Sequence, residues 1–272
     1  MTAPTMRVWG IDADGIACTS PIPVFSPDQV AALRAAADRL DHDFGFSRES
    51  PQRIRGVQHL APDVCETFSA AGFVDQLSVA AAERLRIHPA AHFGCSFNRT
   101  HGPGDGWADP WHLDAAAYTA VVLLSEPEPA RGGQLCLFRG DPAQLWGVLD
   151  RGESPPAEKV ETVPFTRPGE VVLFQGRRVA HAVTALRGAG SDRLTLAVGL
   201  YASGHGDRGL YPGVLVPDEI EAAAPAVERV RAEMLVLLDR LRRRVRWPTD
   251  PFALGRGVAD LDRLRNSLQD LD

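Results

Sequence analysis

The sequence is poor in several residue types and patterns that would assign it to a specialised class of protein. Lysine occurs once, at Lys159, and all other basic residues are arginine. Acidic residues outnumber basic ones by 35 to 29, which gives a formal net charge of -6. This balance provides no general electrostatic attraction to nucleic acids or anionic membranes, so we expect neither as a partner.

Cysteine is also scarce, and no hydrophobic run approaches membrane-spanning length. The four cysteines form no Cys-x-x-Cys pair and lie tens of residues apart, at Cys18, Cys65, Cys95 and Cys136. This spacing predicts reduced thiols, with neither a zinc-binding cysteine pair nor a dense disulfide framework. No apolar stretch reaches the roughly 20 residues that span a bilayer, and the first residues do not resemble a signal peptide. We therefore expect a soluble, cytoplasmic protein.

What the 272 residues do contain is typical of one globular domain, with 44% hydrophobic and 24% charged residues. Helical patterns dominate segment 1–90, which we expect to be an N-terminal helical support. The run Ser26–Leu40 has a serine cap, a proline in the first turn and apolar residues at helical spacing, and Pro62–Leu85 predicts a second helix. Between them, Asp41–Leu60 is polar and aperiodic, which is typical of a loop that could cover a site.

Segment 91–203 has a different pattern, in which short β-rich runs are bounded by Gly, Pro or Asp. These runs are Ala91–Arg99, Ala117–Ser125, Gln134–Phe138, Lys159–Phe165, Glu170–Phe174, Val179–Leu186 and Arg193–Tyr201. Closely spaced strands without intervening helices predict an antiparallel sandwich or barrel. The expected fold class is therefore mainly β with flanking helices.

Segment 204–272 returns to helical spacing, with expected helices at Val216–Arg246 and Val258–Leu271. The first of these has an apolar stripe formed by Val227, Val230, Met234, Leu237, Leu238 and Leu241. The stripe could cover the barrel of its own chain or that of a partner, so a homodimer is possible. The arginines between positions 240 and 246 are interpreted as a solvated helix end.

The strongest chemical signal is the run Trp111-His112-Leu113-Asp114. In an extended chain, residues two apart point to the same face, so His112 and Asp114 can present a nitrogen and a carboxylate to one point. Alone, such a pair is more often a surface pair than a metal site. Downstream, His181 lies among small and apolar residues, where it is either a hydrogen-bonded core histidine or a ligand. Two histidines and one carboxylate could hold a metal on one face and leave its other positions open.

The basic residue Arg193 opens the apolar run that follows His181, and a guanidinium directed into a barrel needs a carboxylate partner from the protein or from a ligand. Arg187 competes for this role, but it lies in the preceding turn. Together with these residues, the order of WHLD (111–114), RGGQLCLF (131–138), PGEVVLFQG (168–176) and VAHAVTALRGAGSDRLTLAVGLY (179–201) resembles the Fe(II)/2-oxoglutarate-dependent oxygenases, in particular their prolyl-hydroxylase-like branch.

This resemblance implies a double-stranded β-helix (jelly-roll, cupin-like) core and three cofactors or cosubstrates, namely Fe(II), 2-oxoglutarate and O2. It implies that His112, Asp114 and His181 bind the iron as catalytic residues and that Arg193 pairs with the distal carboxylate of 2-oxoglutarate. The reaction implied is hydroxylation of an unactivated C–H bond, with release of succinate and CO2. Because Asp114 fills the position that a small residue takes in the halogenases of the superfamily, hydroxylation is favoured over halogenation, whereas desaturation and epoxidation stay open.

Four further residues are candidates around this triad. Asn98 and Arg99 lie on the strand before the His-x-Asp pair, and we expect Asn98 to contact the cosubstrate and Arg99 the substrate, although strand alternation would turn only one of the two inward. Trp107 and Trp111 flank the metal pair, where they would line the substrate entrance or simply pack.

Three functions fit these residues. A small-molecule hydroxylase, acting on an amino acid or a specialised metabolite, is the first. The alternatives are a hydroxylase of a protein or peptidyl residue, and a non-catalytic cupin-like barrel that binds a metal or a ligand.

Overall fold

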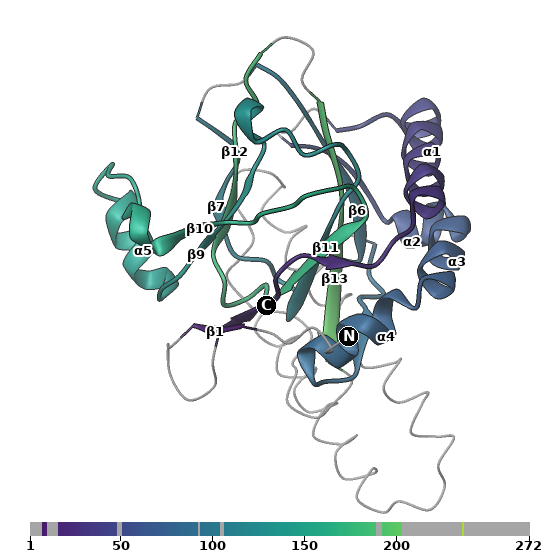
Figure 1. Ribbon diagram of the computed structural model, residues 1–272, viewed down its shortest axis with the longest axis horizontal. Coiled ribbons are helices and arrows are strands. Elements are labelled where there is room, and N and C mark those ends of the chain that lie inside the picture. Colours follow the sequence, from purple (N-terminus) through teal and green to yellow (C-terminus); the bar gives the residue numbers. More distant parts are fainter. Residues whose placement is uncertain are drawn as a thin grey trace, which may run out of the picture.

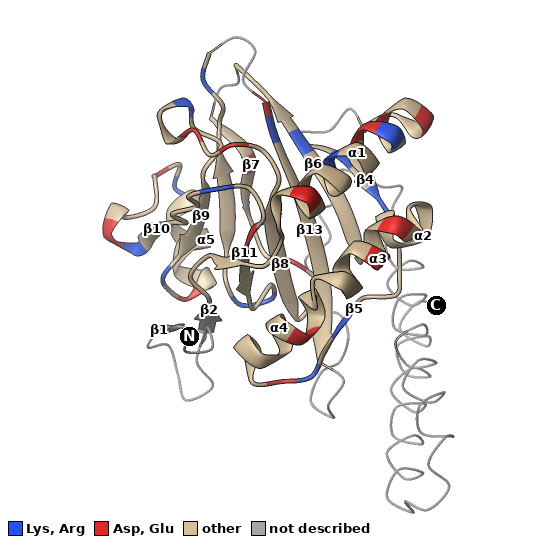
Figure 2. Cartoon of the chain, turned by 45° about the vertical axis from the view of Figure 1, so that its right-hand side comes forward, with Lys and Arg blue, Asp and Glu red and all other residues tan. Residues whose placement is uncertain are grey.

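The computed structural model describes residues 7–9, 16–47, 51–91, 93–103, 106–188, 192–202 and 236 of the chain. Two antiparallel sheets face each other, and helices cover the outer face of the larger sheet (Figures 1 and 2). The expected mainly β, double-stranded β-helix fold with flanking helices is therefore confirmed. None of the described helices is long and apolar enough to cross a lipid bilayer.

The larger sheet has the strand order β1-β2-β11-β8-β13-β6-β4, with β3 paired to β11 and β5 paired to β13. Its strands are β1 (Arg7–Trp9), β2 (Ile16–Cys18), β3 (Ile22–Pro23), β4 (Gln52–Arg55), β5 (Leu85–Ile87), β6 (Cys95–His101), β8 (Tyr118–Leu123), β11 (Glu170–Phe174) and β13 (Asp192–Ala202). The smaller sheet has the order β10-β9-β12-β7. Its strands are β7 (Trp107–His112), β9 (Leu135–Phe138), β10 (Val160–Thr162) and β12 (His181–Thr184).

Five α-helices flank the sheets in the described part of the chain. They are α1 (Pro27–Phe44), α2 (Val57–Leu60), α3 (Pro62–Ala70), α4 (Phe73–Ala81) and α5 (Pro142–Leu149), and two short 3-10 turns span Pro129–Arg131 and Ala157–Lys159. Helix α1 begins where the sequence predicts, because Ser26 caps it and exchanges hydrogen bonds with Gln29 in a capping box.

Side-chain alternation along the strands separates two cores. On β13, Leu194 and Leu196 pack with the helices against the outer face of the larger sheet, whereas Arg193 and Thr195 are directed into the space between the sheets. That inner space is filled by residues of both sheets, among them Val121, Leu135, Val172, Phe174 and Val183. The barrel interior is therefore an apolar chamber into which a few polar side chains project.

Three expectations differ from the structure. The helix expected over residues 62–85 is two helices, because Gly72, with φ of 59°, ends α3 and redirects the chain into α4 before β5. The expected loop 41–60 contains the end of α1, the strand β4 and the helix α2, so segment 1–90 supplies strands as well as helices. Helix α5 lies between β9 and β10, although the sequence predicted that the core strands follow one another without intervening helices.

The expected C-terminal helices, Val216–Arg246 and Val258–Leu271, lie outside the described residues, with the exception of Val236. Val236 is helical and buried.

Candidate metal centre

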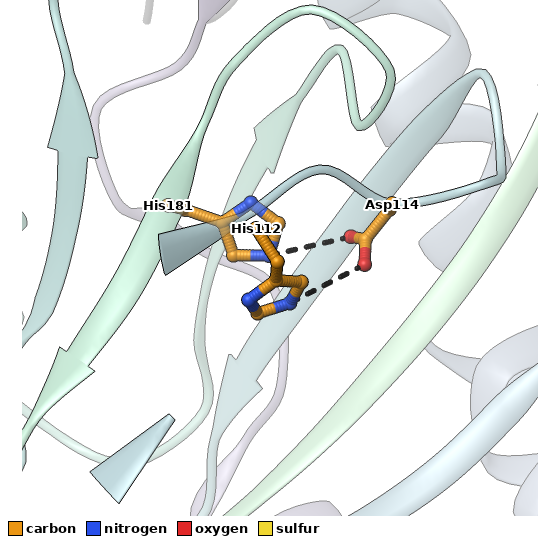
Figure 3. A group of neighbouring side chains, drawn as sticks. All are labelled: His112, Asp114 and His181. Atoms are coloured by element: carbon orange, nitrogen blue, oxygen red, sulfur yellow. Dashed lines mark ion pairs between the residues drawn. The ribbon is translucent and has the colours of Figure 1, made fainter. Parts of the chain in front are cut away.

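Three side chains, two of them close in the sequence and the third almost 70 residues later, meet inside the barrel (Figure 3). His112 is the last residue of β7, Asp114 follows it by two residues, and His181 is the first residue of β12. Strands β7 and β12 are neighbours, and His112 lies directly across from His181 in their register. One ligand atom from each of the three residues lies within 4.8 Å of the others. The structure thus brings together the two histidines and the carboxylate that the sequence singled out.

Hydrogen bonds to the backbone orient both imidazole rings. Nδ1 of His112 lies 2.7 Å from the carbonyl oxygen of Pro110, and Nδ1 of His181 lies 3.1 Å from that of Val179. A carbonyl can only accept, so each Nδ1 donates and each Nε2 keeps its lone pair. The two Nε2 atoms lie 3.7 Å and 3.5 Å from the carboxylate oxygens of Asp114 (Figure 3). This arrangement directs two nitrogen lone pairs and one carboxylate toward a common point.

Asp114 is held from two sides. Its backbone N–H donates to the carbonyl oxygen of Gly176, at 2.9 Å, and the hydroxyl of Thr119 donates to Oδ2, at 2.5 Å. Thr119 is buried on β8, so the carboxylate is fixed by the larger sheet while the two histidines come from the smaller one. The centre therefore depends on the correct packing of both sheets.

The electrostatics of the group favour the protonation states that metal binding requires. Burial acts to raise the pKa of Asp114, but His181, His112, the Thr119 hydroxyl and Arg53 outweigh it, and the pKa of this carboxyl is lowered. Burial lowers the pKa of His181, and the neighbouring His112 lowers it further. An ionised carboxylate and a neutral imidazole are the forms that coordinate a cation. Metal binding at neutral pH therefore requires little release of protons from Asp114 and His181.

Gly176 leaves no room for a side chain beside the centre. A Cβ atom at this position would lie 2.6 Å from Oγ1 of Thr119, 2.8 Å from the carbonyl oxygen of Ala116 and 3.0 Å from Cβ of Asp114. We expect Gly176→Ala to lower the free energy of unfolding by about 1–3 kcal/mol and to weaken metal binding, since the clash displaces both Asp114 and its hydrogen-bond donor.

Chemical unfolding and a metal titration measure these two effects. Gly147→Ala is the matched control, because a Cβ atom there meets only Nη1 of Arg151, at 3.9 Å, and alanine favours the helix α5. Equal metal affinities of Gly176→Ala and the wild type would show that the close packing does not matter for the centre.

The surroundings of the centre exclude water on the inner side. The ring of Phe174 lies 4.7 Å from that of His181, and His181 is 5% exposed. Val121, Leu135 and Val183 continue the apolar lining away from the centre. A reactive group at the centre would thus be shielded from solvent on this side.

Arg193 projects into the same barrel from β13 and is 7% exposed. A Cβ atom on Gly133 would lie 2.9 Å from Cδ of Arg193, so the second glycine of the RGGQLCLF run makes room for this side chain. Burial lowers the pKa of Arg193 to about 10, and Asp109 acts in the opposite direction, so the guanidinium stays charged at neutral pH. Within the described residues, no carboxylate forms an ion pair with it. Arg193 also lines a cavity of about 570 Å³, together with Gly133, Leu186 and Phe165.

Asn98 and Arg99 point to opposite faces of β6, as strand alternation predicts. Arg99 lies on the outer face, where it forms ion pairs of 2.8 Å with both Asp38 and Asp41 near the end of α1. This placement does not support the substrate contact expected for Arg99. Asn98 lies on the inner face, paired in register with Thr195 of β13, so it remains available to the interior.

Trp107 and Trp111 stand on the outer face of the smaller sheet. Their ring centroids lie 5.2 Å apart, and Trp111 packs with Phe138 and Leu145 beneath α5. Trp111 is 8% exposed, so packing explains it, and the expected role of both tryptophans in lining the substrate entrance has no support from their position.

Two residues beside the centre were not anticipated, namely Arg53 and Asp109. Nη2 of Arg53, on β4, donates to both carboxylate oxygens of Asp109, on β7, at 3.2 and 3.1 Å. Oδ1 of Asp109 lies 3.8 Å from Nδ1 of His112. A bulge in β7 brings Asp109 and His112, three residues apart, to the same face, since His112 pairs with His181 and Asp109 pairs with Val183. The sequence carries no signal for this bulge, although the alternation in QRIR (52–55) could have indicated β4.

Comparisons with known proteins agree with this architecture. No protein-family model matches the sequence, and no curated protein matches it. Among solved structures, the chain is similar to the epimerase SnoN in complex with Fe3+, alpha ketoglutarate and nogalamycin RO, with a TM-score of 0.53 and 15% identity over 75% of this chain and 87% of SnoN.

Two further structures are similar to the same degree. The alpha ketoglutarate dependent carbocyclase SnoK from nogalamycin biosynthesis has a TM-score of 0.53 and 15% identity over 72% of this chain and 87% of SnoK. EctD from S. alaskensis has a TM-score of 0.50 and 18% identity over 74% of this chain and 85% of EctD. The chain therefore has the double-stranded β-helix fold shared with non-heme, α-ketoglutarate-dependent enzymes.

Proposed function

We propose that this protein is an Fe(II)- and 2-oxoglutarate-dependent oxygenase that hydroxylates a C–H bond of a small molecule. The observation that carries this proposal is the presence, in one barrel, of a two-histidine, one-carboxylate cluster and a buried arginine without a carboxylate partner in the described chain. The cluster fits Fe(II), because two imidazole nitrogens and one carboxylate on one side of the ion leave further positions open for the cosubstrate.

In this proposal each residue has a separate task. His112, Asp114 and His181 hold the iron. The hydroxyl of Thr119 fixes the carboxylate of Asp114 by a hydrogen bond. Arg193 binds the distal carboxylate of 2-oxoglutarate with its planar guanidinium, a contact of the kind that lysine cannot reproduce. Bound iron and 2-oxoglutarate would supply the activation of O2, of which one oxygen atom would end in the hydroxyl group of the product and the other in succinate, with release of CO2.

The small-molecule substrate and the hydroxylation outcome have separate support. SnoN, in the same fold, is described in complex with nogalamycin RO, which is a small molecule. Asp114 fills the position at which a halide would need space, so a hydroxyl is the group transferred in our proposal.

An anaerobic titration tests the proposal. Fe(II) and 2-oxoglutarate are added to purified metal-free protein, and the weak visible charge-transfer band between iron and the bound keto acid is recorded. We expect the band to appear only when both are present. Absence of any band, together with binding of zinc added to the same metal-free protein, would instead support a non-catalytic, metal-binding barrel.

A further inference from the structure

The cavity that Arg193 lines lies toward the opposite end of the barrel from the candidate metal centre. On β8, Thr119, which fixes the metal-centre carboxylate, is the second residue, and Leu123, which lines the cavity, is the last. On β12, His181 is the first residue, and Leu186, which lines the cavity, follows the end of the strand. None of the three residues that converge on the metal position lines the cavity. The two sites are therefore separated along the strands.

Arg193 stands at the cavity end of the barrel. Thr195, two residues further along β13, pairs in register with Leu123 at the end of β8. Arg193 is 7% exposed, and within the described part of the chain neither an ion pair nor a hydrogen bond holds its guanidinium. A cosubstrate that reached from the metal centre to Arg193 would thus run along the barrel, with its distal carboxylate pointing toward the cavity.

The cavity offers more room than the distal end of a five-carbon diacid needs. Its volume of about 570 Å³ lies in the range of roughly 300–1,000 Å³ that is typical of pockets for drug-sized ligands. Its buried walls include the apolar side chains of Leu123, Val163 and Leu186. An added methylene group strains a close-packed interior, but it meets no such resistance beside a cavity. The protein therefore does not restrict the chain of the cosubstrate to five carbons at this end.

The charges around the cavity favour a carboxylate at the depth of Arg193. Of the described charged residues that line the cavity, only Arg193 is buried. The acidic residues Glu126, Glu128 and Asp192 are all exposed, and Oε2 of Glu128 is paired with Arg131 at 2.8 Å. A ligand carboxylate is thus attracted to the buried guanidinium and meets acidic groups only farther out.

We propose that the cosubstrate site also accepts 2-oxo diacids that are one methylene group longer than 2-oxoglutarate, of which 2-oxoadipate is the straight-chain member. The guanidinium of Arg193, which no described residue clamps, moves into the cavity together with the more distant carboxylate. This inference rests on the proposed oxygenase function, which it deepens by naming the class of cosubstrate.

The reaction balances in the same way as with 2-oxoglutarate. Cleavage of the bond between the carboxyl carbon and the keto carbon of 2-oxoadipate releases CO2. One atom of O2 enters the new carboxylate of glutarate, and the other enters the hydroxyl group of the product. The keto acid and the C–H bond are oxidised, and O2 is reduced.

Binding to the nickel-loaded protein without O2, measured by calorimetry, tests the inference apart from turnover. Three ligands are compared: 2-oxoglutarate, 2-oxoadipate, and 2-oxohexanoate, which has the longer chain but no distal carboxylate. We expect the dissociation constant of 2-oxoadipate to lie within about tenfold of that of 2-oxoglutarate, whereas a closed pocket separates ligands that differ by one methylene group by roughly 10–200-fold. Arg193→Ala should abolish the preference for 2-oxoadipate over 2-oxohexanoate, because that preference depends on the distal carboxylate.

Variants that fill the cavity then locate the added length. Phe165 is partly buried and lines the cavity, so Phe165→Trp should weaken the binding of 2-oxoadipate by at least about tenfold and leave that of 2-oxoglutarate nearly unchanged. Thr162→Phe should act in the same way from an exposed position on β10, where a larger side chain does not disturb the core. Phe46→Trp is the matched control, since Phe46 is also partly buried but packs beside the helices and does not line the cavity.

Two results would overturn the inference. One is binding of 2-oxoadipate to the wild type that is more than about tenfold weaker than that of 2-oxoglutarate. The other is an equal loss of both diacids in Phe165→Trp and Thr162→Phe. A protein that binds nickel but neither diacid would overturn the oxygenase function as well, whereas normal binding of 2-oxoglutarate alone would overturn only the inference about chain length.

Discussion

Alanine at position 181 should reduce the affinity for Fe(II) by more than about 100-fold, because replacing even the groups that orient metal ligands commonly costs about 10–100-fold. His181 supplies one of the two imidazole nitrogens directed at Asp114, and its ring is fixed by the carbonyl oxygen of Val179. His112 and Asp114 alone would leave the ion with two protein ligands. Anaerobic titration with Fe(II), followed by calorimetry or by the charge-transfer band, measures the loss.

His101→Ala is the matched control for this variant. His101 lies at the end of β6 with its side chain 54% exposed, and it pairs with Asp192 at 3.3 Å, outside the cluster. We expect this variant to bind iron as the wild type does. Undiminished iron affinity in His181→Ala would show that the three side chains meet for a structural reason only.

Removal of the guanidinium at position 193 should weaken 2-oxoglutarate binding by about 2–5 kcal/mol, the cost typical of losing one partner of a buried charge pair. This corresponds to roughly 30-fold to several thousandfold in the dissociation constant. Iron binding in the absence of the cosubstrate should not change, since Arg193 is not part of the metal cluster. The dissociation constant of 2-oxoglutarate, measured anaerobically for Arg193→Ala with Fe(II) present, gives the result.

Two controls accompany the Arg193 variant. Arg193→Lys keeps the charge but loses the planar fork, so its affinity for 2-oxoglutarate should lie between those of wild type and Arg193→Ala. Arg187→Ala removes an exposed arginine from the turn that precedes β13 and should bind the cosubstrate normally. Normal cosubstrate affinity in Arg193→Ala would exclude the role proposed for this residue.

The cluster and most of the strands could be predicted because their signals are local. His112 and Asp114 are two residues apart next to a strand, and β8, β9, β11 and β13 are apolar runs bounded by turn residues. Helix α1 was predictable from its capping serine and proline. Alternation on β6 also predicted correctly that Asn98 and Arg99 face opposite sides. It did not predict that Arg99 would form ion pairs with Asp38 and Asp41.

Other features had signals that were outweighed by a competing pattern. Gly72 interrupts the run 62–85 and is typical of a helix end, yet apolar spacing on both sides suggested continuity. Asp141 caps α5 and Pro142 is the first residue of this helix, which is a typical helix start, but the surrounding region is otherwise rich in strands.

The inward position of Asp109 could not be predicted at all, because it results from a bulge whose extra residue shifts the alternation of β7. The position of Arg53 beside the centre could not be predicted either, because its partner Asp109 is 56 residues away in the sequence and lies on the other sheet. Tertiary pairing, and not local sequence, decides these positions.

The bulge in β7 also affects the tendency of this protein to aggregate. In the described chain, β7 is an outer strand of the smaller sheet, and such strands can recruit a strand from another molecule and start aggregation. Here the bulge breaks the even spacing of hydrogen-bonding groups, and Pro110, in the middle of the strand, has no N–H to donate. The distortion that turns Asp109 toward His112 therefore also makes this border of the sheet a poor template for intermolecular growth.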